Sequence, residues 1–144
     1  MTENLKSLVG KKVLKIFMNE DCLKFETDGG SFTFTTEGDC CSQSVFYDFI
    51  GVKKLLENGP IISVKEIPLS VDDSADQKMY QDSVSGYGFE IVTEHPTFGE
   101  MTSVFSFRNY SNGYYGGSLC DALNVDVSPE ITDDVLETAS YKNP

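Results

Sequence analysis

The sequence has no tryptophan, a single histidine and few basic residues. It also lacks the phosphate-binding loop, the dinucleotide-binding glycine pattern and the paired histidines of a metalloprotease helix. These absences exclude the enzyme classes that those motifs identify. We therefore expect a protein that is not an enzyme.

Long apolar runs are also missing. No stretch approaches the ~18 apolar residues of a membrane helix, and Met1–Lys6 lacks the apolar segment of a secretory signal. These features predict a cytoplasmic protein, in a compartment where thiols stay reduced. Its cysteines are then free to bind a metal or to be buried as small apolar groups: Cys22, Cys40, Cys41 and Cys120.

Charge is the strongest global signal that is present. The chain has 11 basic and 23 acidic residues, which gives a formal net charge of −12. Such a field repels nucleic-acid phosphates and anionic membranes, and it favours basic partners, including proteins that themselves bind DNA or RNA. The alternative is that the acidity only keeps the protein in solution.

Hydrophobic periodicity predicts an α+β fold: a twisted antiparallel sheet of about six strands with one helical segment after the third strand. The expected strands are residues 11–19, 22–27, 31–36, 61–69, 87–94 and 101–110, with 114–125 as a seventh strand or coil. The helix is expected to run through Val45, Phe46, Phe49 and Ile50.

The length of 144 residues predicts one domain, which we place at residues 1–125. Residues 126–144 are acidic and poor in aromatics, so we expect a frayed tail or a weak helix there. On this interpretation the stretch from Val127 onward can be removed without loss of the fold.

Asp39-Cys40-Cys41 is the first candidate site. Thiolates and a carboxylate suit zinc, which takes four such ligands, and His95 is the only imidazole that can join them. The spacing does not match a zinc finger or ribbon, so two buried structural thiols are the alternative. A cysteine nucleophile with His95 as its base is a third interpretation.

Two further clusters suit contacts with a partner. Ser111-Asn112-Gly113-Tyr114-Tyr115 places Tyr114 and Tyr115 after a strong hairpin signal, where they either form an exposed contact patch or cover the sheet. Residues 70–85 form an acidic segment expected to be an exposed loop, with Asp72, Asp73 and Asp76 as candidate partner-binding residues.

Leu8-Val9-Gly10-Lys11, Gly38-Asp39-Cys40-Cys41-Ser42 and the Ser-Asn-Gly-Tyr-Tyr cluster, in this order, resemble a family of small bacteriophage and prophage proteins. The resemblance spans roughly residues 5–123. Many of its members carry a histidine just before Asp-Cys-Cys, where this chain has Gly38. If that histidine is a ligand, His95 is the available replacement.

The chain is also similar to phage anti-CRISPR proteins of the type II-A class, some of which bind zinc. That resemblance implies an inhibitor that evades host defence by binding a type II RNA-guided DNA nuclease in the host cytoplasm. The charge of −12 agrees, because such nucleases have positively charged nucleic-acid channels. The alternative is a phage accessory module that binds a small ligand or another protein, and a hydrolase or redox enzyme comes third.

Overall fold

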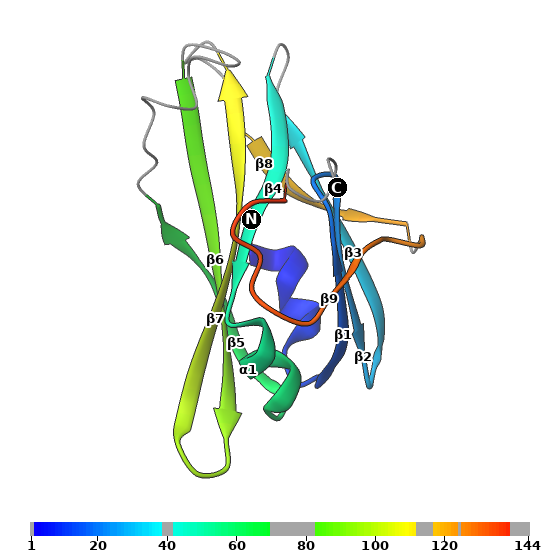
Figure 1. Ribbon diagram of the computed structural model, residues 1–144, viewed down its shortest axis with the longest axis vertical. Helices are drawn as coiled ribbons and strands as arrows, with labels where there is room; N and C mark the ends of the chain where they lie inside the picture. The colour runs from blue at the N-terminus through cyan, green and yellow to red at the C-terminus, as the bar shows by residue number, and fades with distance from the viewer. Residues whose placement is uncertain (1, 39–41, 70–82, 112–116, 124, 139–144) are drawn as a thin grey trace.

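The computed structural model describes residues 2–38, 42–69, 83–111, 117–123 and 125–138. Two antiparallel sheets pack face to face as a sandwich (Figure 1). One sheet has five strands in the order β8 (Gly117–Ala122), β3 (Gly30–Gly38), β2 (Cys22–Thr27), β1 (Val13–Met18) and β9 (Glu130–Ile131). The other has four, in the order β4 (Gln43–Ile50), β7 (Gly99–Ser111), β6 (Ser83–His95) and β5 (Ile61–Pro68).

The expected single α+β sheet of about six strands is therefore wrong, and so is the helix after the third strand. Residues 43–50 form β4, and the short helix α1 (Val52–Glu57) follows it. Phe46 and Phe49 are three positions apart, which is a helical spacing. A register shift between Phe46 and Asp48 lets both rings face the core from a strand instead.

The core consists mainly of phenylalanine. The fully buried rings come from both sheets: Phe25, Phe34, Phe46, Phe49, Phe89, Phe105 and Phe107. Phe25 of β2 lies 6.1 Å from Phe49 of β4, centroid to centroid, so the rings meet across the two sheets. Edge-to-face and stacked pairs at such distances add to the stabilisation from burial alone.

Two short helical segments fill the sides of the sandwich. These are the 3-10 helix η1 (Thr2–Leu8) and α1 (Figure 1). The first buries Leu5 and Leu8, and the second buries Val52 and Leu55. Their apolar side chains join the phenylalanine core. The sandwich is thereby covered where its two sheets diverge.

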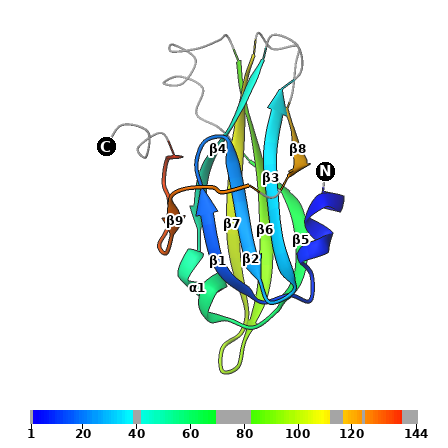
Figure 2. The same ribbon diagram turned by 90° about the vertical axis from the view of Figure 1, so that its right-hand side faces the viewer.

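The segment after β8 crosses the outer face of the five-stranded sheet to reach β9 (Figure 2). Beneath it lies Lys24, which is buried and donates from Nζ to the carbonyl of Val125 at 3.2 Å. β9 then pairs with β1, and Val135 forms a two-way backbone bridge with Phe49 of β4. The C-terminal segment thus joins both sheets, whereas the sequence predicted a frayed tail or a weak helix.

Asp134 adds a second tie to that segment. Its Oδ1 accepts hydrogen bonds from the backbone N–H groups of Gly51, at 2.9 Å, and Val52, at 3.1 Å. Gly51 stands at the N-cap of α1 with no side chain to serve there, so a carboxylate from a distant segment takes the capping role.

Truncation after Asp126 is expected to destabilise the protein. It removes Val127, Ile131 and Val135 from buried positions, and each such side chain contributes about 1.5–3 kcal/mol on burial. We expect Tm to fall by about 10 °C or more. Thermal unfolding followed by circular dichroism measures this, and an unchanged Tm would contradict the tie between the sheets.

A matched pair of variants isolates the helix cap. Asp134→Ala should lower the free energy of unfolding by about 1 kcal/mol. Asp133→Ala removes two exposed contacts, an ion pair with Lys53, 3.9 Å long, and a hydrogen bond from the backbone N–H of Asp134, at 2.8 Å, and should cost about 0.5 kcal/mol or less. Equal losses in urea denaturation would show that Asp134 is not a specific cap.

Candidate functional site

Three segments contain candidate residues predicted from the sequence: 39–41, 70–82 and 112–116. Described residues that flank them meet at one end of the sandwich, which we call the loop end. Gly38 of β3 pairs with Gly117 of β8, and Ser83 of β6 pairs with Ser111 of β7 (Figure 1). Ser42 directly precedes β4, and the first residue of that strand, Gln43, pairs with Tyr110. Segments 39–41 and 112–116 therefore both start and end at the loop end, and segment 70–82 ends there at Ser83.

The candidate residues within those segments lie outside the described part of the chain: Asp39, Cys40, Cys41, Asp72, Asp73, Asp76, Tyr114 and Tyr115. Their common origin at the loop end was not visible in the sequence, because about seventy residues separate the first cluster from the last. Strand order and pairing bring their flanking residues together.

A network of polar side chains lies under the loop end. Asn109 is fully buried and donates from Nδ2 to the hydroxyls of Ser42, at 3.1 Å, and Ser44, at 2.9 Å. Ser44 in turn donates to the carbonyl of Glu37 at 3.0 Å, and its own carbonyl accepts from Thr36. These bonds fix both described ends of the Asp39–Cys41 segment.

The amide oxygen of Asn109 accepts no hydrogen bond in the described structure. A buried acceptor without a donor costs free energy, which a purely structural residue would be expected to avoid. Among the described residues Thr33 Oγ1 is unpartnered in the same way, so it is the position of Asn109 at the loop end that makes it a candidate functional residue, one that the sequence interpretation missed. Its only sequence signal was a polar residue in alternation with Phe105 and Phe107, on the inward face of β7.

His95 lies at the opposite end of the molecule. Ser85 pairs with Asn109 near the loop end, and β6 advances about 33 Å from Ser85 to His95 at ordinary strand geometry. Zinc ligands lie only about 2 Å from their metal. Ser42, the described residue that follows Asp39–Cys41, bonds to Asn109 and so lies far from His95. This distance argues against His95 as a zinc ligand at that segment, and equally as a base for Cys40 or Cys41.

The other thiols do not supply a metal site either. Cys22 and Cys120 pair with Thr35 from opposite sides, so two strand spacings, about 10 Å, separate them. Burial, with the Asp21 carboxylate adding to it, raises the pKa of the Cys22 thiol, which disfavours the thiolate that binds metal. Among the described residues, no three ligating side chains gather around one point.

The outer face of the four-stranded sheet holds a second polar group. Arg108, the only arginine in the chain, stacks on the ring of Tyr47 with its guanidinium carbon 3.5 Å from the ring centroid. Ser106 beside it donates to the carboxylate of Asp48. Burial raises the pKa of Asp48, while the Ser106 hydrogen bond and the Arg108 charge oppose that rise. This arrangement holds Arg108 in place on its own sheet.

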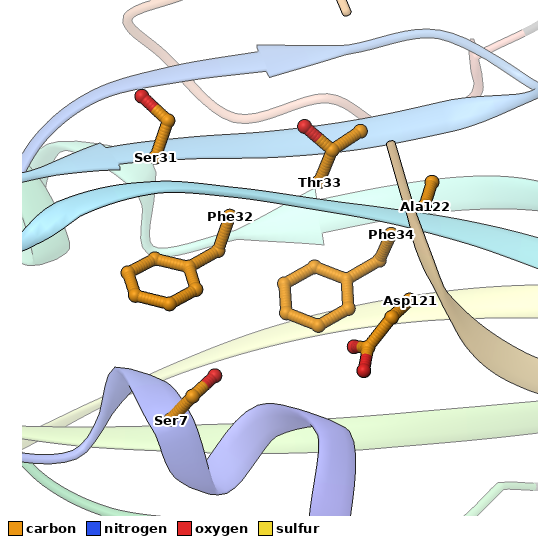
Figure 3. A pocket seen from close by; sticks show the side chains of 7 residues that line it. All are labelled: Ser7, Ser31, Phe32, Thr33, Phe34, Asp121 and Ala122. Carbon is orange, nitrogen blue, oxygen red and sulfur yellow. The ribbon is translucent and has the colours of Figure 1, made fainter. Parts of the chain in front are cut away.

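One open pocket lies between η1 and the end of β8 (Figure 3). The rings of Phe32 and Phe34 point towards η1, where Ser7 lies, and Asp121 stands on the same side of the sheet. Its volume is about 280 Å³. Small-molecule sites usually span about 300–1,000 Å³, so this pocket lies just below that range, and a second one, lined by Lys6, Val9, Ile62, Ser63 and Val64, lies within it at about 370 Å³.

Several lysines hydrogen bond to backbone carbonyls. Lys12 donates from Nζ to the carbonyls of Leu56, at 3.1 Å, and Asn58, at 2.6 Å, and Lys24 donates to Val125. Such contacts satisfy the ammonium groups without neutralising carboxylates. Two other lysines do pair with acids at the surface, Lys53 with Asp133 at 3.9 Å and Lys65 with Glu90 at 3.5 Å.

We expect Asn109→Leu to disturb the loop end specifically. The matched control is Asn58→Leu. Asn58 is also buried, and it donates to Thr93 at 3.1 Å, near the turn that joins β6 to β7. Each variant should lose about 1–3 kcal/mol of stability. In a background with Cys22→Ser and Cys120→Ser, only Asn109→Leu should speed modification of the remaining thiols by an aromatic disulfide reagent. Equal rates in both variants would contradict the anchoring role.

No helix in the described residues is long and apolar enough to cross a membrane; η1 has 7 residues and α1 has 6. No curated protein matches the sequence, and no solved structure matches the fold. Residues 6–120 match the family described as a domain of unknown function, DUF7448. That match covers most of the chain, and the protein therefore belongs to the DUF7448 family.

Proposed function

We propose that this protein is a non-enzymatic inhibitor that binds a basic nucleic-acid-handling protein through its loop end. The observation that supports this most is that described residues flanking three candidate segments meet at one end of a sandwich: both flanks of 39–41 and of 112–116, and Ser83 after 70–82. Segments carried on a rigid scaffold are a recurring way to build a recognition surface. From the resemblance to phage anti-CRISPR proteins, the leading partner is a type II RNA-guided DNA nuclease in the host cytoplasm.

The scaffold suits recognition because its loop end is fixed from below. β6 and β7 are 13 residues each and pair along their whole length, and the phenylalanine core holds them against the other sheet. The Asn109 network then ties β7 to β4 and, through Ser44, to β3. A pre-organised surface loses less conformational entropy on binding, which favours affinity.

Charge sets the class of partner. A chain of −12 is attracted to a positive groove and repelled by nucleic acid itself. An inhibitor of this kind competes with phosphates for a basic channel and needs no chemical step. The distance between His95 and the Asp39–Cys41 segment also disfavours the alternative of a cysteine nucleophile with a histidine base.

Zinc remains part of the proposal, with His95 removed from the expected ligand set. Asp39, Cys40 and Cys41 have the donor chemistry that zinc prefers, and the remaining ligand is not His95. Elemental analysis of tag-free protein purified without chelator should find about one zinc per chain, and His95→Ala should retain it. Zinc loss in that variant would contradict the ligand set, and metal-free wild-type protein would refute zinc altogether.

The charge proposal predicts a kinetic effect. Lysine at Asp72, Asp73 and Asp76 should slow association with a guide-loaded type II nuclease about tenfold or more, because exposed charges steer encounter. Binding of the wild-type protein should weaken as salt rises, since such charges are screened over about 8–10 Å near physiological ionic strength. Biosensor kinetics at two salt concentrations measure both effects, beside an assay of target cleavage.

The matched control replaces three exposed acids elsewhere with lysine, which reverses their charge: Glu66 on β5, Asp126 on the C-terminal segment and Glu130 on β9. Net charge changes equally in both triple variants, so a smaller effect of the control assigns the contact to the loop end. Normal cleavage by several such nucleases, with no complex at low salt, would leave the inhibitor proposal without support.

A further inference from the structure

The hairpin that joins β6 to β7 ends away from the loop end, and its tip projects past the rest of the sandwich (Figures 1 and 2). The turn exposes Phe98, whose side chain is 75% accessible. Scattered exposed apolar residues are common and need no explanation. Phe98 differs because His95 orders the turn that carries it, and exposed glutamates lie beside that turn.

His95 fixes the turn. Its Nδ1 accepts the backbone N–H groups of Thr97, at 3.0 Å, and Phe98, at 3.1 Å. The imidazole also lies against the Phe98 ring, with 4.7 Å between centroids. The histidine that the sequence suggested as a metal ligand thus orders the backbone that presents Phe98, before any partner arrives.

Acids frame the tip. Glu94 and Glu100 are exposed and stand directly opposite each other on the two strands. Like charges at opposed positions of an antiparallel pair destabilise it. The carbonyl of Glu94 accepts from the N–H of Gly59, just beyond α1, where Glu57 is exposed as well. A cation from a partner would relieve this repulsion.

We infer that the hairpin tip is a second docking element, which inserts Phe98 into an apolar pocket rimmed by lysine or arginine on the partner protein. The acidic frame opposes an anionic membrane and a second copy of this chain, so a basic protein is the occupant that charge favours. The identity of that protein rests on the proposed function, which names a guide-loaded type II nuclease.

The two docking elements lie at opposite ends of one rigid hairpin. From Ser83 to His95, β6 extends about 40 Å at ordinary strand geometry. A partner contacted at both ends must therefore present two basic areas at that separation. The tip would supply the apolar anchor and the loop end the long-range charge.

The test measures binding of full-length protein to the guide-loaded nuclease by biosensor kinetics. Phe98→Ala should raise Kd about 30-fold or more, mainly through faster dissociation, as expected for a buried aromatic anchor. Leu136→Ala removes a side chain that is 74% exposed at another place and should change Kd less than about twofold. His95→Ala, with Phe98 intact, should weaken binding by less than Phe98→Ala does.

The outcomes separate the two claims. If wild-type protein binds and Phe98→Ala binds equally well, the tip is no docking element while the loop-end function stands. If Phe98→Ala and Leu136→Ala weaken binding alike, general surface hydrophobicity explains the contact and the tip inference is overturned. If wild-type protein binds no such nuclease, the proposed function fails and the tip inference fails with it. Unchanged circular dichroism in each variant confirms that the fold is intact.

Discussion

The ring of Phe105 contacts the rings of Phe25, Phe46, Phe49 and Phe89, at centroid distances of 6.3, 6.3, 5.5 and 5.2 Å. Phe25 belongs to the opposite sheet, and the others come from strands on either side of β7. This cluster holds the long β6–β7 hairpin against the five-stranded sheet. Both candidate contact areas lie at the ends of that hairpin, so their separation depends on the aromatic core beneath them.

The strands were largely predictable because their alternation is local. Residues 22–27 and 61–69 were expected as strands and became β2 and β5 with nearly the same bounds. Alternation does not say which sheet a strand joins, and this is why one sheet was expected where two exist. The bulge after Phe46 removed the alternation from β4 and left a spacing typical of a helix.

The C-terminal segment escaped sequence reasoning for a different reason. Its buried residues are few and separated by acids, so composition indicated a tail. What holds it is mostly non-local: a strand pair with β1, a bridge to Phe49 and the cap that Asp134 gives to α1. The site was hidden similarly, since Asn109 and Ser42 are distant in sequence and become partners only through strand pairing.

Net charge alone does not select one partner, because any basic groove attracts an acidic protein. Discrimination requires a feature that a wrong partner fails to match. In the proposed complex that feature is geometric: a rigid hairpin sets the separation between the loop end and Phe98, and His95 fixes how the ring is presented. A partner with its basic areas at another spacing would engage one end and lose the second. The sandwich would thus convert a non-specific attraction into recognition of one surface.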